Sequence, residues 1–196
     1  MLDLRGDEHL MLAAKAGDRE AFCTLVDRLR SVLLPFLRHL GCDHATAEDL
    51  TQETLLRLWC AKDGYEVRAS LRTYVLTIAK NCWLSAMRQG RLSSRIAAPL
   101  DATLEPLLAR DGLRGCSPEA ELVNRYTRQR ILDAVARLPW RQRIVFVLAH
   151  IEHLDYAQIS TMLGVAEGTV KSRMHRAVRN LRAALLDETD GHDRKE

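Results

Sequence analysis

The sequence predicts an all-α protein made of two small helical domains joined by an irregular linker. Apolar residues recur at helical spacing through most of the 196 residues, and strand-like alternation is nearly absent. Hydrophobic residues make up 47% of the chain, which is enough to build packed cores. Residues 91–117 interrupt the periodicity with two prolines and two glycines, and this segment is therefore the expected linker.

The first domain, residues 1–90, is expected to contain four helices, whose ends are set by residues that start or stop a helix. Gly17 and Asp18 supply a stop followed by an N-cap. Thr46 is placed to cap the third helix, and Pro35 is expected to kink or split the second. The expected helices are residues 8–16, 19–39, 46–59 and about 70–88.

The second domain, residues 118–186, begins with a proline, which is favourable in the first turn of a helix. Four further helices follow from the spacing of its apolar residues. The last ten residues, 187–196, are mostly charged and are expected to form a frayed tail. The expected helices are residues 118–138, 139–153, 155–163 and 167–186.

Charge is distributed unevenly along the chain, although the net charge is only +3. Residues 67–100 contain six basic residues and no acid, whereas residues 43–56 contain four acids and no lysine or arginine. This separation suggests different surfaces for different partners. The basic residues are Arg68, Arg72, Lys80, Arg88, Arg91 and Arg95, and the acids are Asp43, Glu48, Asp49 and Glu53.

Composition argues against a membrane or disulfide-rich protein. No run approaches the roughly 18 apolar residues of a membrane span. The charged N-terminus lacks the apolar stretch of a signal peptide, so we expect a cytoplasmic protein. The five cysteines form no C-x-x-C pair. This favours small buried residues over a disulfide framework or zinc site, with redox or metal sensing as the alternative.

The sequence also lacks the usual marks of an enzyme. It contains no glycine-rich phosphate loop, no H-E-x-x-H and no nucleophile elbow. His150, Glu152 and His153 are candidate metal ligands, but two histidines at this spacing lack convincing further ligands. We therefore expect no catalytic residue, no metal and no cofactor.

The segment DYAQISTMLGVAEGTVKSRMHRA has the pattern of a helix-turn-helix. Asp155 caps a short first helix, whose Ile159 and Leu163 face inward. Gly164 suits the tight turn, because a residue with a side chain at positive φ would cost energy there. The apolar stripe of the second helix is Val170, Met174, Ala177, Val178 and Leu181.

The opposite face of this second helix carries groups suited to DNA. A guanidinium can bond the acceptors of guanine in bidentate fashion, so Arg176 is the first candidate for reading a base. Lys171, Arg173 and Arg179 are better placed to hold phosphates. A solvated basic face is the alternative, which the preceding glycine turn disfavours. The candidate residues are Thr169, Lys171, Ser172, Arg173, His175, Arg176 and Arg179.

Long stretches of this sequence resemble bacterial sigma factors of the sigma-70 family, in their extracytoplasmic-function (ECF) branch. LPWRQRIVFVLAHIEHLDYAQISTMLGVAEGTVKSRMHRAVRNLR is similar to the C-terminal region that binds promoters, known as region 4. AEDLTQETLLRLW and LRTYVLTIAKNCWLSAMR resemble region 2, which docks on the polymerase and opens DNA. These motifs occur in the expected order and are separated by a suitable linker.

The resemblance implies an alternative sigma factor, which has no catalytic site and lends promoter specificity to core RNA polymerase. It places the −35 promoter element on the 167–186 helix and the −10 element on the 71–88 helix. It also implies contacts with the β′ clamp and the β flap of the polymerase, and control by an anti-sigma factor. An autonomous helix-turn-helix regulator would explain the C-terminal motif equally well, but not the helices of the first domain.

The helix of residues 47–59 carries an acidic face, which repels phosphate and suits a basic protein surface. The resemblance implies that this face docks on the clamp coiled coil of the β′ subunit. An ordinary solvated face is the alternative. The candidate docking residues are Glu48, Asp49, Gln52 and Glu53.

The basic helix of residues 71–88 has the groups needed to hold single-stranded DNA, namely cations, aromatic rings and an amide. Tyr74 is equally consistent with a core position, and Trp83 either stacks on a base or is buried against the first helices. The candidate residues are Arg72, Tyr74, Lys80, Asn81, Trp83 and Arg88. The chain departs from the usual family pattern at Leu71, Tyr74, Leu76, Ser85 and Ser160.

Overall fold

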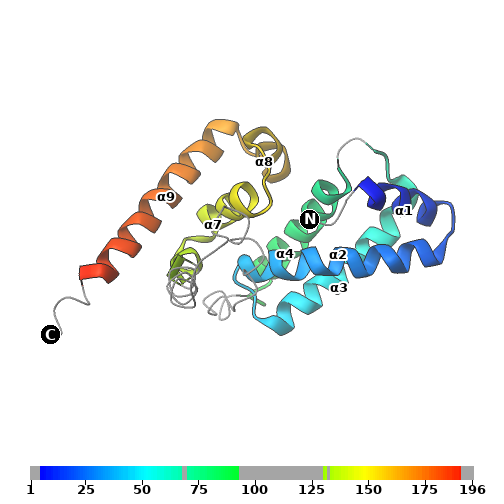
Figure 1. The fold of residues 1–196 in the computed structure, drawn as a ribbon, viewed down its shortest axis with the longest axis horizontal. Coiled ribbons are helices and arrows are strands. Elements are labelled where there is room, and N and C mark those ends of the chain that lie inside the picture. The colour runs from blue at the N-terminus through cyan, green and yellow to red at the C-terminus, as the bar shows by residue number, and fades with distance from the viewer. Residues whose placement is uncertain (1–4, 68–69, 93–129, 132, 191–196) are drawn as a thin grey trace, which may run out of the picture. The chain divides into compact units, whose positions relative to one another are not determined.

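The computed structural model describes residues 5–67, 70–92, 130–131 and 133–190, and every regular element in those residues is a helix. Figure 1 shows two compact units, the first with α1 to α4 and the second with α7 to α9. None of the helices in the described residues has both the length and the hydropathy of a membrane-spanning segment. The elements are α1 Arg5–Lys15, α2 Arg19–His39, α3 His44–Ala61, η1 Lys62–Gly64, α4 Leu71–Arg88, α7 Trp140–Phe146, the π-helical turn η2 Val147–Ile151, α8 Tyr156–Leu163 and α9 Glu167–Asp190.

The core of the first unit lies between stripes of apolar residues at helical spacing. In α2 these residues recur every three or four positions, which places them on one face of the helix. Helix α3 packs against α4, and the buried positions of both helices follow the same rule. The buried residues of α2 include Leu25, Leu29, Leu33, Phe36 and Leu37, and those of α4 include Leu71, Val75, Leu76, Ala79, Cys82, Trp83 and Ala86.

The structure corrects the predicted cap of the third helix and, of the two alternatives for Pro35, excludes a split. Helix α3 is capped by Asp43, whose Oδ1 accepts a hydrogen bond at 2.8 Å from the backbone N of Thr46. The prediction that Thr46 is the cap is therefore wrong: it lies in the first turn of a helix that begins at His44. Pro35 lies inside α2, which continues on both sides of it and is not split.

The second unit is built around α9. Residues 130–131 and 133–137 are helical, and together with Leu138 they contribute Ala134, Val135 and Leu138 to a core shared with Ala177 and Leu181 of α9. Helices α7 and α8 both pack on α9. The single helix expected over 139–153 is instead α7 followed by η2. His153, directly before the helix-turn-helix, has a positive φ of 55°.

Several expectations fall on other parts of the chain. Residues 93–117 of the expected linker and residues 118–129 of the first helix of the second domain lie outside the described residues. Helix α9 extends to Asp190, four residues beyond its expected end at 186. The remainder of the expected tail, residues 191–196, is also outside the described part.

Candidate nucleic-acid and protein-docking surfaces

The helix-turn-helix is held by local hydrogen bonds at its entry and at its turn. Asp155 Oδ1 accepts from the backbone N of Gln158 at 2.7 Å, and Gln158 Oε1 accepts from the backbone N of Asp155 at 3.0 Å, forming a capping box. Gly164 ends α8 in the left-handed conformation, with φ 64° and ψ 38°. The expected roles of Asp155 and Gly164 are therefore confirmed.

A serine adds a further hydrogen bond across this turn. Ser160 Oγ donates to the backbone carbonyl of Val165 at 2.7 Å. This hydrogen bond links α8 to the residues that lead into α9, and so helps to fix how α9 is presented.

Helix α9 has a buried and an exposed face, as expected. Val170, Met174, Ala177 and Leu181 are buried, and Val178 is half-buried. The candidate DNA-binding residues lie on the remaining surface of the helix. Lys171, Ser172, His175, Arg176 and Arg179 are exposed, and Thr169 and Arg173 are half-buried.

The cations of α9 differ in their surroundings. Lys171 Nζ lies 2.8 Å from Glu167 Oε1, and this hydrogen bond raises the pKa of the exposed Lys171. Arg176 and Arg179 form no ion pair with any residue that the structure describes. They are therefore the more available of these side chains for phosphate or base contacts.

Arg141 of α7, which was not among the predicted DNA-binding residues, lies close to Arg173 on α9. The pKa of Arg173 is lowered, first by burial and then by the positive charge of Arg141 on α7. The guanidinium carbon of Arg141 lies 5.0 Å from the ring centroid of Trp140. Helices α7 and α9 are also joined by a hydrogen bond from Asn180 Nδ2 to Gln142 Oε1 at 2.9 Å. The basic surface of the unit thus includes α7.

Helix α4 exposes only some of its candidate residues. Asn81 and Arg88 are exposed, and Arg72 and Tyr74 are half-buried. The Tyr74 ring packs against Tyr65, with centroids 5.5 Å apart. Ser70 caps the helix, its hydroxyl accepting from the backbone N of Thr73 at 3.3 Å.

Two of the α4 candidates are placed differently from the surface role expected of them. Trp83 has no exposed surface, so of its two predicted positions the structure has the buried one. A buried indole presents no face for a base to stack on. Lys80 is only 7% exposed, and burial lowers its pKa, so its ammonium is not displayed as a free surface cation would be. Both lie on or beside the apolar face of α4.

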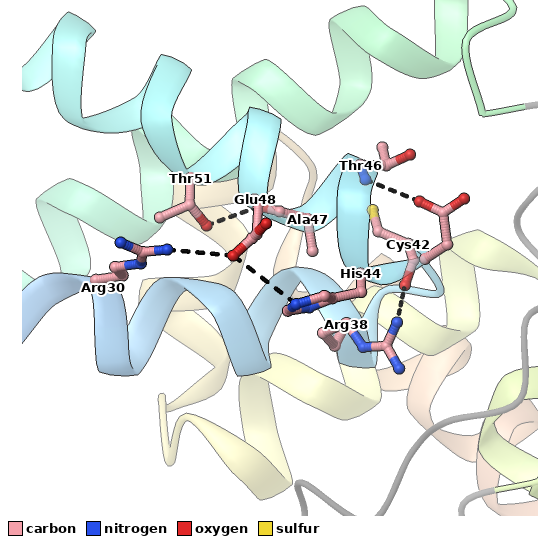
Figure 2. Close-up of polar contacts among 9 residues, drawn as sticks. Arg30, Arg38, Cys42, His44, Thr46, Ala47, Glu48 and Thr51 are labelled. Atoms are coloured by element: carbon pink, nitrogen blue, oxygen red, sulfur yellow. Dashed lines mark hydrogen bonds and ion pairs between the residues drawn. The ribbon is translucent and has the colours of Figure 1, made fainter.

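The four docking candidates on α3 fall into two groups. Figure 2 shows Arg30 of α2 and His44 reaching toward Glu48, with Arg30 Nη2 at 3.1 Å and His44 Nε2 at 3.8 Å from Glu48 Oε1. Glu48 therefore lies at the edge of α3 that faces α2. The other three, Asp49, Gln52 and Glu53, share the outward face.

The two outward carboxylates are not equivalent. Glu53 is half-buried and pairs with Arg57 Nη2 at 2.7 Å and with Arg91 Nη2 at 4.0 Å. Asp49 is exposed and forms no ion pair within the described residues. Its charge is the least compensated on the face, so it is the carboxylate most available to a basic partner.

The histidines before the helix-turn-helix do not gather with other ligands. The His150 ring packs on Phe146, with centroids 4.7 Å apart. In the part of the chain that the structure describes, no three His, Cys, Asp or Glu side chains are placed as metal ligands.

Comparison with known protein families gives one match for each of the two helical units. Sigma-70 region 2 matches residues 25–92, and sigma-70 region 4 matches residues 128–181. The ECF RNA polymerase sigma factor SigL of Mycobacterium tuberculosis is 34% identical over 176 residues, covering 89% of this chain and 94% of SigL. The ECF sigma factor SigW of Bacillus subtilis is 30% identical over 178 residues, covering 88% of this chain and 93% of SigW.

A solved structure shows the same fold. The structure of CnrH in complex with the cytosolic domain of CnrY is similar with a TM-score of 0.62 and 23% identity, covering 93% of this chain and 97% of CnrH. The identity to SigW and SigL extends over both helical units. This chain therefore belongs to the family of ECF RNA polymerase sigma factors.

Proposed function

We propose that this chain, as a sigma factor, binds core RNA polymerase through α3 and directs it to promoters that α9 and α4 recognise. Sigma factors initiate transcription and are not enzymes, so binding surfaces carry the function. We assign residues 1–90 to polymerase docking and the −10 element, residues 91–117 to a linker, and residues 118–186 to the −35 element. The site of action is the cytoplasm, where the polymerase works.

The observation that supports this proposal most is the opposite character of two exposed helix faces. Helix α9 presents Arg176 and Arg179 without carboxylate partners among the described residues, directly after a glycine turn. Helix α3 presents an uncompensated Asp49. A basic face attracts the DNA backbone, whereas an acidic face repels it and favours a basic protein. One chain with both is suited to connect a protein to DNA.

Helix α4 has a narrower part in this proposal than the sequence suggested. Asn81 and Arg88 are exposed, and Arg72 and Tyr74 are partly so. We assign base contact to Asn81 and backbone contact to the arginines. Trp83 is assigned to the core instead, because it is fully buried.

Two protein contacts are proposed besides the β′ clamp. The second unit contacts the β flap, as the family resemblance implies. An anti-sigma factor holds the chain inactive. The support for this partner is that structures of the same fold were solved as complexes, CnrH with CnrY and the RpoE of Bartonella quintana with the anti-sigma factor NepR.

Binding to core RNA polymerase tests the proposal. The purified chain is expected to co-elute with the core enzyme on a sizing column, and Asp49→Lys is expected to abolish co-elution by placing a cation against a basic surface. Asp27→Lys is the matched control, because Asp27 is exposed on α2 and introduces the same change of charge. If the wild-type chain does not co-elute, the docking proposal is wrong and a self-sufficient DNA-binding protein remains.

A further inference from the structure

Three large apolar side chains are exposed among the described residues: Leu56 at 65%, Val67 at 54% and Leu12 at 43% exposure. A single exposed leucine is common in proteins and needs no explanation by itself. Leu56 differs from Leu12 in its position, because it lies on α3, the helix that carries the proposed docking residues. The residues that flank Leu56 on α3 determine what kind of partner could cover it.

Leu56 continues the outward acidic face of α3. It follows Gln52 by four residues and Glu53 by three, and Cys60 follows it by one turn. At 3.6 residues per turn these side chains fall within an arc of about 100°. Glu53 is half-buried and the others are exposed. We call Asp49, Gln52, Glu53, Leu56 and Cys60 the α3 stripe.

The two halves of the α3 stripe have different chemistry. Asp49, Gln52 and Glu53 make its first half polar and acidic. The second half is apolar, and it is bordered by Trp59, whose ring packs on Phe22 of α2 with centroids 4.6 Å apart. Lys62 Nζ lies over the same Trp59 ring, 4.6 Å from its centroid. A partner lying along α3 would thus meet carboxylates first and an apolar surface after them.

We infer that the polymerase-docking surface extends along the whole α3 stripe and that Leu56 is its apolar anchor. The occupant is a helical surface of core RNA polymerase that presents cations beside an apolar strip. The spacing of three and four residues along the stripe is how one helix presents its side chains to another. This inference rests on the docking role proposed above for α3.

The charged and the apolar residues of the α3 stripe have different roles in binding a partner. Charges across an interface mainly steer and orient the partners, whereas buried apolar anchors supply most of the affinity. Glu53 must exchange its contacts with Arg57 and Arg91 before it can serve a partner fully. Leu56 has no such competing interaction, and covering it removes apolar surface from water.

The first test is substitution of the anchor. Leu56→Ala is expected to weaken binding to core RNA polymerase about tenfold or more, as truncation of an interface anchor does. Leu12→Ala removes the same atoms from an exposed site on α1 and is expected to leave affinity within about twofold. Thermal unfolding of both variants shows that they fold, because neither side chain is buried.

The second test uses the thiol at the end of the stripe. Cys60 is free and exposed, so its alkylation by iodoacetamide, read by mass spectrometry of its peptide, reports whether the partner covers it. Bound polymerase is expected to slow alkylation of Cys60 about tenfold or more. A thiol introduced as Leu12→Cys, off the stripe, is expected to react equally fast with and without polymerase.

The outcomes separate this inference from the docking proposal. If Asp49→Lys abolishes binding while Leu56→Ala binds like the wild type, docking through α3 stands and the apolar anchor is wrong. Unchanged alkylation of Cys60 in the complex would equally overturn the extended surface. If the wild-type chain does not bind the polymerase at all, both ideas fail together.

Discussion

Replacing Gly164, at the turn of the helix-turn-helix, is expected to lower the stability of the second unit by an amount that follows from its backbone conformation. Gly164 has φ 64°, a conformation that L-residues with a side chain rarely adopt. A Cβ built there meets nothing within 4 Å, so Gly164→Ala introduces backbone strain without a steric clash. The backbone N–H of Gly164 can still donate to the carbonyls of α8. We therefore expect a loss of about 1 kcal/mol in the stability of this unit.

Gly168, four residues later, supplies the matched control. It lies in the first turn of α9 at an ordinary helical φ, and a Cβ there also meets nothing within 4 Å. Because glycine is a poor helix former, Gly168→Ala is expected to stabilise the unit by up to about 1 kcal/mol. The same substitution thus has opposite signs at two positions in one motif.

Hydrogen exchange in the full-length chain measures this difference locally. For Gly164→Ala, the amides of α8 and α9 are expected to exchange about fivefold faster than in the wild type. For Gly168→Ala they are expected to exchange more slowly. If Gly164→Ala leaves exchange unchanged or slows it, the left-handed turn is not the feature that holds the motif together, and the reasoning fails.

Three further experiments, with five substitutions between them, test other parts of the structure. Asp43→Ala is expected to cost about 1 kcal/mol of unfolding free energy in urea, and Thr46→Ala clearly less, because Asp43 supplies the capping oxygen. Arg176→Ala is expected to weaken promoter binding by the holoenzyme and relax its preference at one −35 base, whereas Arg179→Ala weakens all sequences alike and lowers the salt dependence. His153→Gly is expected to raise thermal stability slightly by relieving its positive φ; unchanged or lower stability would contradict this.

Much of the helical architecture could be predicted from the spacing of apolar residues, since burial follows that spacing closely. The stripe of α9 and the glycine turn before it follow directly from the period of a helix and from glycine's freedom at positive φ. The cap of α3 could not be predicted in the same way, because Asp43 and Thr46 are both good capping residues and lie three positions apart. Which of them caps depends on the helix beginning at His44.

The burial of Trp83 could have been found from the same signal. Leu76, Ala79, Trp83 and Ala86 are spaced by three and four residues and are all buried. The alternative position for Trp83, on the surface and stacked on a base, follows only from the expectation that α4 needs aromatic rings to bind DNA, and it disagrees with this spacing. A tryptophan at a core position of an apolar stripe is better interpreted as core.

Other features carry no signal in the sequence. The π-helical turn over Val147–Ile151 has an ordinary apolar composition. The proximity of Arg141 to Arg173 depends on how α7 packs against α9. The exposure of Leu56 is equally hidden, because Leu55 and Leu58 beside it are buried. Such features depend on the packing of helices against each other, which local patterns do not encode.

Transcription from mapped start sites shows whether this chain directs RNA polymerase to promoters. Core RNA polymerase would transcribe genomic DNA of the source organism with and without this chain, and the 5′ ends of the transcripts would be mapped. We expect new 5′ ends at discrete sites that share two upstream sequence elements at fixed spacing, and we expect Asp49→Lys to abolish them. If the chain co-purifies with the polymerase yet produces no new 5′ ends, it does not direct initiation and the proposed function is wrong.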